Sequence, residues 1–137
     1  DQSVSLAGRP QSASIRETID LAQYCEMLGY HRFWVSEHHN HDTITGTAPE
    51  IVMAAIGATT ERIRIGSAGV MLPHYSALKV AEQFRVLDAI APGRIDLGLG
   101  RAPGWGRRIT GRRSPRISAS PIASPISSPR AKAARRH

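Results

Sequence analysis

The spacing of apolar residues predicts an amphipathic helix near the start of the chain. Apolar side chains recur three or four residues apart from Ile15 to Leu28, which is the period of one helix face. Ser14 and Glu17 have the spacing of a capping box, so we expect the helix to begin at Ser14. Gly29 follows directly and is a residue type that commonly ends helices.

Strand and helix patterns then alternate along the chain. Strands are predicted at 33–35 and 63–67, and apolar residues alternate along a further strand at 95–99. Helices are predicted at 47–59, which opens with a second capping-box pattern, and at 76–90. Such alternation is typical of successive βα units on a parallel sheet. The fold class is therefore α/β, as either a doubly wound sheet or a barrel, and in both the functional residues gather where strands end.

Candidate functional residues follow three of the predicted strands. These segments are Glu37-His38-His39, Ser67-Ala68-Gly69 and Gly100-Arg101. Three histidines and two acidic residues between 37 and 42 could also form a metal site. However, adjacent loop residues rarely converge on one ion and no helical His-x-x-x-His pair is present, so no metal is expected.

The formal charge of +7 is unevenly distributed along the chain. Residues 1–104 carry nine basic and eleven acidic side chains, a balance of −2, whereas residues 105–137 carry nine basic and none. The second segment repeats Ser-Pro pairs and has too little apolar surface for a core, so we expect it to be disordered. Its Arg, Pro, Ser and Ala bias is typical of an out-of-frame reading of a GC-rich gene. A basic arm that binds nucleic acid and an inert linker are the weaker alternatives.

Cysteine content and hydropathy point to a reducing compartment. Cys25 is the sole cysteine, which excludes an internal disulfide, and its place on the apolar helix face indicates a small buried hydrophobic residue. No apolar run is long enough to span a membrane, and no signal-peptide pattern is present. A cytoplasmic protein is therefore expected.

Three ordered stretches resemble one known family. They are residues 37–39, residues 65–73 and residues 92–104, which read EHH, IGSAGVMLP and PGRIDLGLGRAPG. Together they are similar to the bacterial-luciferase-like, flavin-dependent oxidoreductases, and the similarity extends over residues 1–104. The resemblance implies a (β/α)8 TIM-type barrel, of which about the first four βα units are present, with Asp1-Gln2-Ser3 as the end of a first strand.

The resemblance also implies roles for individual residues. His38 corresponds to the active-site histidine, with Glu37 and His39 beside it. The Ala68-Gly69 bond corresponds to a non-proline cis peptide against the flavin ring, and Gly100 and Arg101 correspond to a segment where the backbone approaches the flavin and an arginine reaches its phosphate. A neutral imidazole can exchange a proton near pH 7, and a guanidinium offers paired donors to phosphate. Structural alternatives stay open, including a carbonyl-bonded His38 and a surface Arg101.

The function implied by the family is monooxygenation of a small organic substrate with reduced FMN and O2. A flavin reductase would supply the reduced FMN, and a homodimer is possible. The alternatives are an F420-dependent oxidoreductase of the same family, and a truncated, non-catalytic protein whose basic tail binds nucleic acid.

Overall fold

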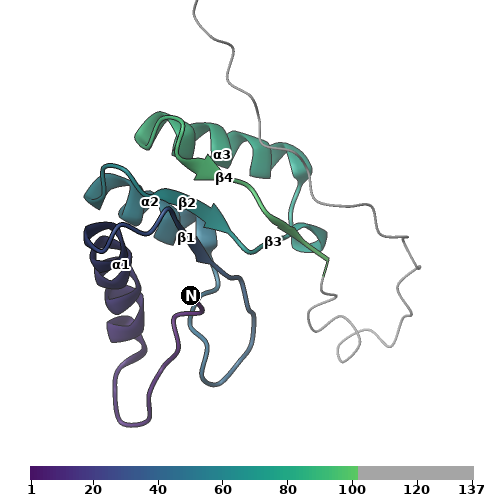
Figure 1. Cartoon of the computed structure of the whole chain (residues 1–137). Coiled ribbons are helices and arrows are strands. Elements are labelled where there is room, and N and C mark those ends of the chain that lie inside the picture. Colours follow the sequence, from purple (N-terminus) through teal and green to yellow (C-terminus); the bar gives the residue numbers. More distant parts are fainter. Residues whose placement is uncertain (102–137) are drawn as a thin grey trace, which may run out of the picture.

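The computed structural model describes residues 1–101, so the predicted tail at 105–137 and residues 102–104 lie outside the described part of the chain. The elements in chain order are α1 (Gln11–Met27), β1 (Arg32–Val35), α2 (Pro49–Thr59), β2 (Arg64–Ser67), β3 (Val70–Met71), the 3-10 helix η1 (Leu72–His74), α3 (Ala77–Ile90), β4 (Ile95–Asp96) and β5 (Leu99–Gly100). The α/β class expected from the sequence is confirmed (Figure 1).

All named strand pairs are parallel. The main sheet has the order β1-β2-β4, with Phe33 opposite Ile65 and Ile65 opposite Ile95. A second sheet pairs β3 with β5, so the chain passes from one sheet to the other after both β2 and β4. Asp1 donates to Trp34 O (2.6 Å) and accepts from Ser36 N (3.0 Å), as a parallel neighbour of β1 would. This agrees with the expected strand end, whereas the count of four βα units stays a prediction.

The hydrophobic core lies between the main sheet and the three helices. β1 alternates between exposed and buried residues, and its buried Phe33 and Val35 pack with Ile65 of β2. α2 contributes the fully buried Met53 and Ile56. The other buried core residues are Val52 of α2, Val70 of β3, and residues of α1, α3 and the connecting segments: Ala22, Ile63, Val80, Phe84, Leu87 and Ala91. Cys25 is half-buried and packs against this core.

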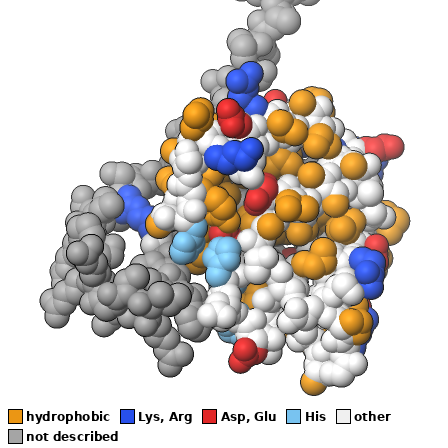
Figure 2. Space-filling model, turned by 180° about the vertical axis from the view of Figure 1, so that it is seen from behind, with side chains coloured by type: hydrophobic (Ala, Val, Ile, Leu, Met, Phe, Trp, Pro, Cys, Tyr) orange, Lys and Arg blue, Asp and Glu red, His pale blue; other side chains and the backbone are white. Residues whose placement is uncertain are grey.

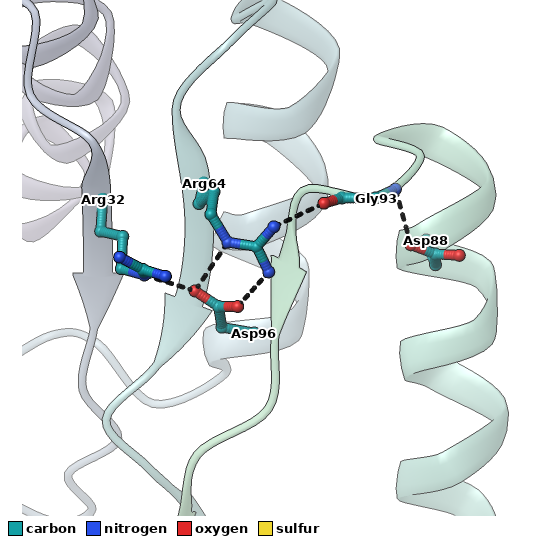
Figure 3. Close-up of polar contacts among 5 residues, drawn as sticks. All are labelled: Arg32, Arg64, Asp88, Gly93 and Asp96. Carbon is teal, nitrogen blue, oxygen red and sulfur yellow. Dashed lines mark hydrogen bonds and ion pairs between the residues drawn. The ribbon is translucent and has the colours of Figure 1, made fainter. Parts of the chain in front are cut away.

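A charged cluster joins the three strands of the main sheet (Figure 3). Arg64 of β2 bonds to both carboxylate oxygens of Asp96 on β4, and Arg32 Nε of β1 lies 3.3 Å from Asp96 Oδ2. Arg64 also donates to the carbonyl of Gly93 (2.6 Å), whose N–H donates to Asp88 (3.0 Å). Partial burial alone would raise the pKa of Asp96, but the hydrogen bond from Arg64 holds that pKa below its ordinary value.

The helix ends differ in how well the sequence predicts them. The expected stop at Gly29 is confirmed: Gly29 has φ +81°, its N–H donates to Glu26 O, and the N–H of Tyr30 donates to Cys25 O. These two bonds form a Schellman motif. The expected start at Ser14 is wrong, because α1 begins at Gln11 after Pro10, and Ser14 lies buried within the first turns. In α2 the capping box is also wrong, since the helix begins at Pro49 without a side-chain cap.

The strand predicted at 95–99 is divided into β4 and β5. The cause is Ser67, whose hydroxyl donates to Gly98 O (2.9 Å) and accepts from Gly98 N (3.1 Å), so a side chain replaces backbone pairing there. A Cβ on Gly98 would lie 2.1 Å from Ser67 O, so glycine is required. Among the described residues, no helix is long and apolar enough to span a membrane.

Candidate functional site

The predicted site residues lie at one edge of the fold, where parallel strands end. Residues 37–39 follow β1, and residues 68–69 lie between β2 and β3. Gly100 belongs to β5, and Arg101 follows it as an exposed residue. Because parallel strands point the same way, their carboxyl ends meet at this edge. The expectation that these segments gather at strand ends is confirmed.

The Ala68-Gly69 peptide bond is cis, as the family resemblance implies. Ala68 N donates to Val35 O (2.7 Å), which joins this segment to the end of β1. A Cβ on Gly69 would lie 2.8 Å from Gly98 O, and one on Gly100 would lie 3.3 Å from Gly69 O. Two glycine segments therefore pack backbone against backbone and leave little room between them for any side chain.

His38 is half-buried in the loop after β1. Its backbone N–H donates to Gly46 O (2.9 Å), and its Nδ1 lies 3.3 Å from the Ser36 hydroxyl. The described residues show no hydrogen bond from His38 to residues 68–69 or to Gly100. The ring is thus held by its own loop, and Nε2 makes no hydrogen bond within residues 1–101.

Glu37 differs from its neighbours in the loop, since its side chain has no exposed surface and is fixed by several hydrogen bonds. Oε2 accepts from the backbone N–H of Met71 (2.9 Å). Oε1 accepts from the Tyr75 hydroxyl (2.7 Å) and lies 2.5 Å from Nε2 of His39. The carboxylate therefore ties the histidine loop to β3, two residues after the cis bond, and to the segment that precedes α3.

Two residues of this cluster, His74 and Tyr75, are absent from the set predicted from the sequence. The ring centroids of His39 and His74 lie 5.2 Å apart in an edge-to-face arrangement. Figure 2 shows histidine side chains gathered on one face of the molecule, beside apolar side chains. Burial, and after it the hydrogen bond to Glu37, raises the pKa of the Tyr75 hydroxyl above its ordinary value. The signal available in the sequence was an aromatic residue directly after the turn that follows β3.

Hollows elsewhere on the molecule do not touch this edge. One, of about 450 Å³, lies at the opposite ends of β1 and β2 and is lined by residues such as Tyr30, Arg32 and Arg62. Another of about 450 Å³ lies between α2 and α3. Within residues 1–101, no group of three or more His, Cys, Asp and Glu side chains is placed to hold a metal ion. At the strand ends themselves, Ala68 and Leu99 are exposed and Gly69 and Gly100 are half-buried.

Comparison with known proteins places this arrangement in a family. A family model described as luciferase-like monooxygenase matches residues 2–116. The N-acetyl-S-alkylcysteine monooxygenase of Bacillus subtilis (strain 168) is 56% identical over 104 residues, which are 76% of this chain and 31% of that protein. The chain thus spans about a third of the length of the curated relatives it matches.

Solved structures agree with the sequence match. The structure of apo-MsnO8 is 50% identical, has a TM-score of 0.72, and matches 74% of this chain and 31% of its own. The oxygenating constituent of 3,6-diketocamphane monooxygenase from the CAM plasmid of Pseudomonas putida, in complex with FMN, is 27% identical, has a TM-score of 0.66, and matches 70% of this chain and 26% of its own. The family resemblance drawn from the sequence is confirmed. The chain belongs to the luciferase-like monooxygenase family.

Proposed function

We propose that this chain carries part of the cofactor site of a reduced-FMN-dependent monooxygenase that acts on a small organic substrate with O2. The complete protein would be a (β/α)8 barrel, with this edge at the carboxyl ends of its first strands. The observation that carries the proposal is the close backbone packing of Gly69 against residues 98–100. This packing supports a flat surface, free of bulky side chains, against which a planar ring can lie.

The residues around this surface fit an anionic flavin. Arg101 directly follows β5, and its guanidinium can offer paired donors to a phosphate group. The imidazole of His38 has the chemistry of a group that accepts or donates a proton during catalysis. FMN, when bound, would supply the oxygen chemistry, while the protein positions it and excludes water. Two similar proteins, an N-acetyl-S-alkylcysteine monooxygenase and a monooxygenase constituent solved in complex with FMN, support the same assignment.

A chimeric enzyme tests the proposal directly. Residues 1–101 of this chain would replace the matching segment of the Bacillus subtilis monooxygenase, whose remaining sequence completes the barrel. With a flavin reductase, NADH and O2, we expect substrate oxygenation. His38→Ala should lower kcat by about 100-fold or more, because a positioned proton-transfer group contributes at least that much. FMN affinity, measured by fluorescence quenching, should change far less.

The control is His31→Ala, which removes an exposed histidine that precedes β1 at the opposite end of that strand. It should leave both kcat and FMN affinity unchanged. Full turnover by the His38→Ala chimera would remove His38 from the mechanism. Turnover that requires reduced F420 in place of reduced FMN would overturn the cofactor assignment.

A further inference from the structure

The buried carboxylate of Glu37 has an unusual set of neighbours. Three groups from different parts of the chain converge on its two oxygens: the N–H of Met71, the hydroxyl of Tyr75 and Nε2 of His39. An ionised carboxylate accepts hydrogen bonds but donates none. Each of the three neighbours, including Nε2 of His39, must therefore donate a hydrogen bond to the carboxylate.

The position of the protons follows from this rule. The N–H of Met71 can only donate, and the Tyr75 hydroxyl donates to Oε1 of Glu37. His39 therefore carries its proton on Nε2, since an unprotonated nitrogen 2.5 Å from a carboxylate oxygen would be repelled. In a neutral imidazole, a proton on Nε2 leaves Nδ1 with a free lone pair.

We propose that Glu37 fixes His39 in the tautomer protonated on Nε2, and that Tyr75 holds Glu37 in place for this task. Glu37 and Tyr75 are then positioning residues, and Nδ1 of His39 is a hydrogen-bond acceptor for a ligand N–H or O–H group. The relevance to catalysis rests on the proposed function, which places His39 beside the flavin. The tautomer itself is a property of the chain without any ligand.

The other groups around this cluster do not compete for the Nε2 proton. His74 approaches His39 through an edge-to-face ring contact. His38 bonds to Ser36 and to Gly46 instead. Glu50 acts on Tyr75 through its charge, which is the smallest of the effects on that hydroxyl. Glu37 is the sole carboxylate that hydrogen-bonds the His39 ring among the described residues.

Nitrogen NMR of the ring tests the proposal on the full chain. Long-range 1H–15N spectra at a pH of about 8.5, where unperturbed histidines are neutral, distinguish protonated from unprotonated ring nitrogens. We expect His39 to show one tautomer, with the proton on Nε2. His31 is the internal reference, because it is exposed and its ring makes no hydrogen bond within residues 1–101. Its nitrogens should report the ordinary mixture of both tautomers.

Glu37→Gln should invert the His39 tautomer. The buried N–H of Met71 needs an acceptor, so the amide oxygen stays on that side and the amide NH2 turns toward His39. Nε2 must then accept, and the proton moves to Nδ1. Glu61→Gln, at an exposed glutamate whose side chain makes no hydrogen bond in the described part of the chain, is the matched control and should change nothing.

Two results would overturn the proposal. One is a wild-type His39 with the same tautomer mixture as His31, and the other is unchanged Nε2 protonation in a folded Glu37→Gln chain.

If the Glu37→Gln variant unfolds, Tyr75→Phe provides the test instead, with Tyr30→Phe as its control. Loss of the Tyr75 donor leaves His39 as the sole donor to Oε1, so the Nε2–H resonance should move downfield, and an unmoved resonance contradicts the role of Tyr75. FMN is titrated separately, so failure to bind flavin with the tautomer intact counts against the proposed function alone.

Discussion

Tyr75 differs from the two other tyrosines of the chain in its surroundings. Tyr24 and Tyr30 are 53% and 60% exposed, whereas Tyr75 is half-buried and bonds to Glu37. Burial, followed by the Glu37 hydrogen bond, raises the pKa of Tyr75. Absorbance at 295 nm should therefore show one of the three tyrosines ionising only above the ordinary tyrosine pKa of about 10.

The same shift in the pKa of Tyr75 affects stability at alkaline pH. A raised folded-state pKa stabilises the fold fully below the unfolded pKa of about 10, and this stabilisation is lost as pH rises toward the folded value. Tyr75→Phe should remove this alkaline loss from urea unfolding curves, while Tyr24→Phe should retain it. Three tyrosines that titrate together would contradict the raised pKa.

For individual residues, the sequence predicts which ones belong to the site better than it predicts which groups their side chains contact. The position of Glu37 after a strand marks it as a site residue, but the sequence does not show that its side chain turns inward. That orientation depends on Met71 and Tyr75, which lie 34 and 38 residues further along the chain. The predicted cis bond at Ala68-Gly69 came from the family resemblance, because spacing and composition carry no information about it.

At the scale of elements, Asp96 links all three strands of the main sheet through Arg32 and Arg64. Partial burial opposes ionisation, but the hydrogen bond and charge of Arg64 keep the pKa of Asp96 below its ordinary 3.8. Such a carboxylate stabilises the fold above the unfolded pKa, and the contribution disappears as pH falls through the lowered pKa. Asp96→Asn should thus lower the free energy of unfolding at pH 7 by about 1–2 kcal/mol.

Urea unfolding at several pH values provides the check. The difference in free energy of unfolding between wild type and Asp96→Asn should decrease as pH falls below about 3.8, where the wild-type carboxyl also becomes neutral. Asp42→Asn is the matched control, since Asp42 is exposed and forms no ion pair within residues 1–101. If the difference in free energy of unfolding stays constant down to acid pH, the charge of Asp96 is not the cause of the stabilisation.

Element boundaries show where local patterns lose their predictive value. The stop at Gly29 depends on backbone freedom within a few residues, and the sequence predicts it correctly. The start of α1 does not follow from the Ser14 pattern, because Pro10 allows the helix to begin earlier and Ser14 is buried instead. The break between β4 and β5 depends on Ser67, 31 residues away, which alternation of apolar residues does not reveal.

At the scale of the whole molecule, one face of the main sheet lacks a covering layer in the described part of the chain. Trp34 lies on this face over Gly66 and is 44% exposed. The matched residues cover 31% of the Bacillus subtilis relative, which therefore contains further sequence, and in a closed barrel this face is the interior. The remaining two thirds of the Bacillus subtilis relative, expressed as a separate polypeptide, should therefore bind this chain and raise its thermal midpoint.

Surface variants distinguish this association from nonspecific adhesion. Trp34→Asp should abolish the rise in thermal midpoint, because it introduces a charge into the proposed interior. Tyr24→Asp, at a similarly exposed aromatic residue on α1, should not. Equal effects of both substitutions would show that the association does not use the open face of the sheet.

The contact between Ser67 and Gly98 also affects which sequence changes the edge tolerates. One hydroxyl both donates to and accepts from the same residue, so it takes the place of a peptide unit between two backbone segments. A longer side chain at position 67 would push the segments apart, and any side chain at position 98 would collide with Ser67 O. The side chains tolerated at the two positions therefore depend on each other. Loops beyond them can diverge in sequence while the spacing between the two glycine segments stays constant.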